Sequence, residues 1–243
     1  VVTVLAASRA GLILAPLPLG AREAEASALC ERLGVRAVVT VARSEDEGHG
    51  ERLRDVAAEL FQIRFVFGAG GDLPDGLVDL RQVFEEAATL GAAPHVTRKG
   101  NAADHAATVE ITALGATGDD AEASAAPRVL PLPRSHNHWI ACGLMTLLEA
   151  GIGADAVIVS PFAFSGPIGL GVALETWLIA GASLVVGLTR ATDTLAEEAE
   201  RHGATHVIVP ARFAARLADR LSLRRLSVTL VAIGEDEPSD RPM

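Results

Sequence analysis

Short runs of β-branched residues alternate with longer amphipathic segments along most of this 243-residue chain. Helix-like segments lie at 22–34, 51–61, 77–90, 135–151, 166–181, 193–203 and 211–221; strand-like runs lie at 35–41, 63–67, 108–114, 156–160, 183–188, 205–210 and 227–234. Strands that alternate with helices are joined by crossovers, which make the strands parallel and cover both faces of the sheet. We therefore predict an α/β fold of doubly wound, mostly parallel sheets flanked by helices.

One segment interrupts this alternation. Residues 92–107 are polar and irregular, and they contain Pro94, Lys99 and Gly100. Such a break predicts a connector between two similar α/β lobes, residues 1–91 and residues 108–243. We expect the first lobe to be incomplete at its N-terminus, because the chain opens inside a helix-like segment. We expect the second to be truncated at its C-terminus, because a strand ends at Gly234, close to the last residue.

The charge and cysteine content exclude several classes of protein. The sequence has 21 Lys and Arg residues against 31 Asp and Glu residues, a formal net charge of −10. It therefore lacks the excess of basic residues that neutralises phosphates in nucleic-acid-binding proteins. Cys30 and Cys142 have neither CxxC nor Cys/His spacing, which argues against a disulfide framework or a metal site and fits a reducing cytoplasm. Residues 156–174 carry no charge, but Pro161 and Pro167 interrupt them, so we expect no membrane span.

Three glycine-rich turns are candidates for anion binding. Residues 68–71 (GAGG) follow a strand but lack a dinucleotide fingerprint and predict a surface turn. Residues 151–156 match G-x-G-x-x-A, yet they follow a helix and precede a strand, so we interpret Gly151 as a helix C-cap. Residues 115–118 (GATG) follow a strand and open a long predicted loop, 115–134, that leads to a helix. This is the arrangement of a phosphate loop, although the GK[ST] of a P-loop NTPase is absent.

The histidines favour structural roles. His136 and His138 have no nucleophile or carboxylate at a recognisable spacing, and Ser135 before them predicts a helix N-cap. His206 lies in a buried strand pattern and is predicted to be a hydrogen-bonded core residue. No residue is assigned a catalytic role, and no metal ligand is assigned.

Several segments, taken in order, carry a resemblance to a known family. They are an early helix–turn–helix–strand stretch at 2–41, ALGATG at 113–118 with Pro127-Arg128 and Ser135-His136-Asn137, SPFAFSGPIGLGVALETWLIAGASLVV at 160–186, HGATHVIVPARFAARL at 202–217 and LVAIGEDEPS at 230–239. In this order they resemble the N-terminal part of the adenylate-forming superfamily, the AMP-forming acyl-CoA ligases and their relatives.

The resemblance implies an activity and assigns residues to it. It implies that a carboxylic acid attacks the α-phosphate of ATP with Mg²⁺ to give acyl-AMP, and that CoA or a carrier-protein thiol then takes the acyl group. It implies that a C-terminal domain of the same protein carries the catalytic lysine, so that this segment alone is inactive. The residues implied are Gly115, Thr117, Gly118 and Arg128 for the phosphates, Gly234 and Glu235 for the adenine side, and Phe164 and Gly166 for the acyl pocket.

Departures from the family pattern leave a second reading open. The loop has Ala113, Leu114 and Ala116 where the family has hydroxyl-bearing residues, and an acidic insertion precedes Arg128, which replaces the family's lysine. Losing hydroxyls and adding carboxylates is expected to weaken ATP binding. The alternative is a non-catalytic, degenerate paralogue that acts as a binding or docking module. A third reading is an unrelated doubly wound protein that binds another small anion.

Overall fold

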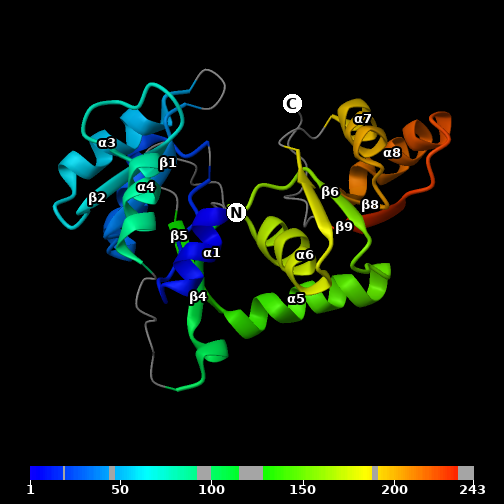
Figure 1. Ribbon diagram of the computed structural model, residues 1–243, viewed down its shortest axis with the longest axis horizontal. Helices are drawn as coiled ribbons and strands as arrows, with labels where there is room; N and C mark the ends of the chain where they lie inside the picture. Colours follow the sequence, from blue (N-terminus) through cyan, green and yellow to red (C-terminus); the bar gives the residue numbers. More distant parts are fainter. Residues whose placement is uncertain (19, 44–46, 92–99, 115–127, 188–190, 235–243) are drawn as a thin grey trace, which may run out of the picture. The chain divides into compact units, whose positions relative to one another are not determined.

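The computed structural model describes residues 1–18, 20–43, 47–91, 100–114, 128–187 and 191–234. Two compact units form. One holds residues 2–100 and 107–133, and the other holds residues 101–106 and 134–243 together with Val1. Each unit contains a parallel sheet with helices packed against it (Figure 1). The predicted fold class, α/β with parallel sheets flanked by helices, is therefore confirmed.

The unit built mainly from the first hundred residues contains a three-stranded parallel sheet in the order β1–β2–β3. Val38 of β1 and Val66 of β2 point to a core that also contains Ala26 and Cys30 from the second helix and Val56 from the third. The elements of this sheet and its helices are α1 (Val2–Arg9), α2 (Glu23–Leu33), β1 (Ala37–Val41), α3 (His49–Glu59), β2 (Phe65–Ala69), β3 (Val78–Asp79) and α4 (Leu80–Leu90).

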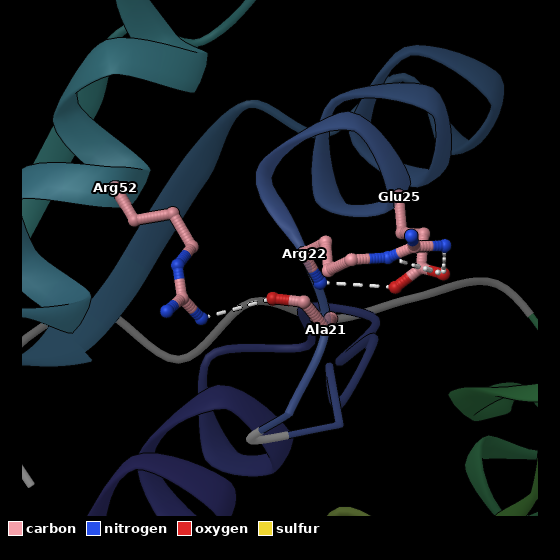
Figure 2. Close-up of polar contacts among 4 residues, drawn as sticks. All are labelled: Ala21, Arg22, Glu25 and Arg52. Atoms are coloured by element: carbon pink, nitrogen blue, oxygen red, sulfur yellow. Dashed lines mark hydrogen bonds and ion pairs between the residues drawn. The ribbon is translucent and has the colours of Figure 1, made fainter. Parts of the chain in front are cut away.

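At the start of α2, Arg22 donates hydrogen bonds to the Glu25 carboxylate, as Figure 2 shows. The backbone N–H of Arg22 donates to Oε2 of Glu25 at 2.9 Å, and the Arg22 guanidinium donates to Oε1 at 2.8 Å. These bonds, the guanidinium bond first, lower the pKa of Glu25 below its ordinary value. Arg52 of α3 donates to the carbonyl of Ala21 at 2.9 Å, so α3 holds the residue that leads into α2 (Figure 2).

A strand occupies part of what the sequence analysis predicted as a loop over 115–134. β4 (Ala106–Leu114) pairs with β5 (Arg128–Ser135) in a two-stranded sheet. Pro131 and Pro133 made this segment look irregular, because proline cannot donate to a ladder. β5 pairs only with β4 among the described residues, and an edge strand tolerates proline. The prediction of a loop up to residue 134 was therefore wrong for 128–134.

The other unit contains a four-stranded parallel sheet in the order β7–β6–β8–β9, with helices on both faces. Ile158 and Ile208 pack on one face under α5, η2 and α6, whereas Val159, Val207 and Val209 pack on the other under α7 and α8. The elements are η1 (Ala102–Asp104), α5 (His136–Ala150), β6 (Val157–Ser160), η2 (Ile168–Leu174), α6 (Glu175–Ala180), β7 (Ser183–Val186), α7 (Thr192–His202), β8 (His206–Pro210), α8 (Ala211–Leu223) and β9 (Thr229–Ile233).

The helix ends follow the sequence signals. Gly34 after α2 and Gly151 after α5 both adopt left-handed backbone conformations, with φ of 62° and 66°, and their N–H groups close the last turn. The interpretation of Gly151 as a C-cap is thus confirmed. Ser135 caps α5, because its Oγ accepts from the N–H of His138 at 3.3 Å. Across the described residues, no helix is long and apolar enough to cross a membrane.

Candidate functional site

The strand order of the four-stranded sheet indicates which edge of the sheet is the candidate for ligand binding. The chain runs from β6 to β7 on one side of β6, and then crosses to the other side for β8 and β9. All four strands are parallel, so their carboxyl ends lie at one edge. In doubly wound sheets, ligands bind outside the carboxyl ends where the strand order reverses. Here that point lies between β6 and β8.

The segment that leaves β6 carries two of the predicted residues. Ser160 ends the strand fully buried, and its Oγ accepts from the N–H of Phe162 at 3.3 Å, which turns the chain. Phe162 is buried in the core, whereas Phe164 and Gly166 are half-buried. A Cβ at Gly166 would meet nothing within 4 Å, so the backbone there borders open space. Phe164 and Gly166 thus lie in the connection that leaves the carboxyl end of β6 and leads to η2.

Gly169 positions this segment, and the sequence analysis missed it. A Cβ at Gly169 would overlap the carbonyl oxygen of Ala163, so only glycine lets the helix approach the loop so closely. The sequence predicted one helix over 166–181. In the structure its first part, η2, is π-helical, and α6 follows it. The repeated glycines at 166, 169 and 171 were the available signal.

Glu175, the first residue of α6, lies half-buried beside α5. A Cβ built at Gly143 of α5 would lie 2.8 Å from the Cβ of Glu175, so the helices cross closely here. Thr176 next to it is fully buried and donates to the carbonyl of Gly143 at 3.2 Å. Burial raises the pKa of Glu175, because water solvates its charged form poorly.

Gly234 shares the sheet edge with Phe164 and Gly166. It directly follows β9, is exposed, and has open space around the position of a Cβ. Because β8 lies between β6 and β9, the two predicted groups are at the same edge but not on neighbouring strands. Glu235, the other residue predicted for the adenine side, lies outside the described residues.

The predicted phosphate loop joins β4 to β5. Gly115, Thr117 and Gly118 lie outside the described residues, and Arg128 is the first residue of β5. Arg128 belongs to one compact unit, through residues 107–133, and the sheet-edge residues belong to the other, through residues 134–243. The loop was predicted to lead straight into a helix; β5 stands between the loop and α5. Among the described side chains, no group of three potential ligands could hold a metal ion.

His206 has the structural role that its strand pattern predicted. It is buried in β8, its Nε2 donates to the carbonyl of Ala150 at 3.1 Å, and its Nδ1 lies 2.8 Å from Oγ1 of Thr205. The histidine ties the end of α5 to the sheet, and the prediction of a hydrogen-bonded core residue is confirmed.

Comparisons with known proteins match the fold. No family model and no curated protein matches this sequence. Among solved structures, ATP-bound MatB from Rhodopseudomonas palustris gives a TM-score of 0.67 at 23% identity, over 96% of this chain and 41% of that one. The long-chain-fatty-acid-CoA ligase FadD1 from Archaeoglobus fulgidus gives 0.68 at 17% identity, over 91% of this chain and 39% of that one. The anthranilate CoA ligase AuaEII, in complex with anthranoyl-AMP, gives 0.65 at 13% identity, over 84% and 36%.

The fold is that of the N-terminal domain of the adenylate-forming ligases. At these identities the likeness concerns the fold alone. The chain spans well under half of the length of these three structures, at 36% to 41%. The fold that the sequence resemblance implied is thus confirmed.

Proposed function

We propose that this chain is the N-terminal part of an ATP-dependent ligase that activates a carboxylic acid. A carboxylate oxygen attacks the α-phosphorus of ATP, the bond to the β-phosphate oxygen breaks, and pyrophosphate leaves with the bonding electrons. A thiolate then attacks the acyl carbon, AMP leaves, and a thioester forms. The thiol belongs to CoA or to a carrier protein.

One observation carries this proposal. The segments that the sequence resemblance assigned to the acyl pocket and the adenine side, Phe164 with Gly166 and Gly234, lie at one edge of a parallel sheet, the edge where such folds bind ligands. The assignment came from motifs, whereas the edge follows from strand order, so the two arguments are independent. The ATP-bound MatB and the anthranoyl-AMP complex of AuaEII support the same chemistry in this fold.

The proposal gives roles to the remaining predicted residues. Backbone amides at Gly115 and Gly118 and the hydroxyl of Thr117 hold the β- and γ-phosphates, and the guanidinium of Arg128 pairs with phosphate oxygens where the family has lysine. Glu235 lies with Gly234 on the adenine side. Mg²⁺ is held chiefly through the ATP phosphates, which is its usual mode in such sites.

The complete reaction needs more than these residues. The resemblance assigns the catalytic lysine to a C-terminal domain, and we propose that such a domain completes the enzyme and that this segment alone is inactive. We also propose two lobes at 1–91 and 108–243 joined by 92–107, with the phosphate loop at 113–128. Neither cysteine forms a disulfide, which supports a role in the reducing cytoplasm.

Carboxylate-dependent exchange of labelled pyrophosphate into ATP tests the proposal on the full-length gene product. We expect exchange with at least one member of a panel of aliphatic and aryl acids. Arg128→Ala should raise the ATP concentration needed for half-maximal exchange about tenfold or more. Arg216→Ala, at an exposed position on α8, is the matched control and should leave the exchange unchanged.

The phosphate loop has lost hydroxyl-bearing residues and gained acidic ones, which favours one alternative, a binding or docking module without ATP chemistry. That module predicts no exchange with any acid and no heat on titration with Mg·ATP, from a protein that unfolds cooperatively. This pair of results would overturn the ligase. Exchange that is unchanged by Arg128→Ala would remove this arginine from the site and leave the ligase standing.

A further inference from the structure

Cys142 and His138 form a thiol–imidazole pair on α5. They are one helical turn apart, and Sγ of Cys142 lies 3.8 Å from Nε2 of His138. Both side chains are partly exposed. A thiol is nucleophilic only as its thiolate, and a neighbouring imidazole that accepts the proton favours that form. Neither residue has a part in the proposed ligase reaction.

The His138 ring is held in place by its neighbour. Trp139 is buried, with 3% of its surface exposed, and it meets the imidazole edge to face, with ring centroids 5.0 Å apart and planes at 71°. Edge-to-face contacts between aromatic rings are favourable and restrict ring orientation. The imidazole is therefore held close to the thiol by a residue that is itself fixed in the packing between α5 and η2.

Cys30 provides a contrast within the same chain. It is 1% exposed in the core between α2, α3 and the first sheet. Burial raises the pKa of its thiol, because the thiolate would lose its hydration. Of the two cysteines in this sequence, one is thus buried in a core, and the other is half-buried beside an imidazole.

We propose that Cys142, with His138 as its proton acceptor, is a modification site that forms mixed disulfides with small disulfides. His138 takes the thiol proton, and the thiolate attacks one sulfur of the disulfide. The old S–S bond breaks as the new one forms. The departing thiolate takes the proton back from His138 and leaves as a thiol. Cys142 is oxidised, and half of the small disulfide is reduced.

The adduct would lie beside the segment that positions the candidate site. A Cβ built at Gly171 of η2 would be 3.0 Å from the Cβ of Cys142 and 2.9 Å from the Trp139 ring. α5 and η2 are thus in close contact at this point, and η2 directly follows Phe164 and Gly166. The modification site is part of the same unit as the sheet edge, but it involves different residues.

Oxidised glutathione is the probe, applied to the full-length protein under native conditions. We expect peptide analysis to find glutathione on Cys142 and none on Cys30. Followed peptide by peptide, the rate at Cys142 should exceed the rate at Cys30 by at least about tenfold. Unfolding in guanidinium should abolish the difference. Equal native rates at the two cysteines would overturn the proposal.

His138→Gln tests the pair itself in the Cys30→Ala background. We expect about a tenfold slower reaction at neutral pH. As the pH is lowered, the rate of the variant should begin to decrease at a higher pH than the rate of the parent does. His202→Gln, at an exposed histidine on α7, is the matched control and should change neither. An unchanged rate and pH profile in a folded His138→Gln protein would show that the imidazole takes no part. Circular dichroism checks the fold of each variant.

Discussion

Arg225 turns the chain out of α8 in a left-handed backbone conformation, with φ of 58°. Its N–H bonds to the carbonyl of Ser222, and the N–H of Leu226 bonds to that of Leu221. This is the position at which helices usually have glycine. We expect Arg225→Gly to stabilise the protein by about 0.5–1 kcal/mol, measured by urea unfolding, because glycine removes the Cβ strain. Arg225→Ala keeps the strain and should bring no gain; an equal gain from alanine would contradict this reason.

Glu175 makes stability depend on pH. Its pKa is raised in the folded protein, so the fold binds this proton more tightly than the unfolded chain does. Its contribution is most favourable below the ordinary pKa of a glutamate and is lost as pH rises through the raised value. We expect Glu175→Gln to raise the melting temperature by about 1–2 °C at pH 7 and to match the wild type near pH 4. Glu149→Gln, on an exposed part of α5, should show no such pH-dependent difference.

At the scale of elements, η2 packs very closely against the segment that follows β6. A side chain at Gly169 would overlap the Ala163 carbonyl, and backbone cannot move aside as a flexible side chain can. We expect Gly169→Ala to destabilise the protein by about 1–3 kcal/mol, against the usual helix preference for alanine. Gly187→Ala, in the same unit with open space around it, should change stability little. Equal unfolding midpoints for the two variants would refute the close approach.

At the scale of the whole molecule, each compact unit has its own core. Val56 belongs to the core of the first sheet, and Leu195 to a core of the four-stranded sheet, and both are fully buried. No described residue is shared between these clusters. We expect calorimetry to resolve two unfolding transitions. Val56→Ala should shift only one transition to lower temperature, and Leu195→Ala only the other. Each substitution should reduce the free energy of unfolding of its own unit by about 2–4 kcal/mol. A single transition that both variants shift would contradict this independence.

Much of the fold and part of the candidate site could be predicted from sequence. The period of the hydrophobic pattern predicted the elements and the fold class, because each helix or strand must bury one face. Gly34, Gly151 and Ser135 marked helix ends, because caps depend on groups close in the chain. The family resemblance singled out Phe164, Gly166 and Gly234, but that they follow strands of one parallel sheet was seen only in the structure. Their roles in binding remain proposals.

Three features were decided only by tertiary structure. Arg128–Ser135 is a strand despite two prolines, because β4 offers it a partner at an edge. The first half of the helix after Gly166 is π-helical, where glycines let it pack against the Ala163 carbonyl and against α5, about 30 residues earlier in the chain. The order β7–β6–β8–β9 places the reversal between β6 and β8. The hydrophobic pattern is local and sets which faces are buried, whereas partner, order and close approach depend on contacts between segments far apart in the chain.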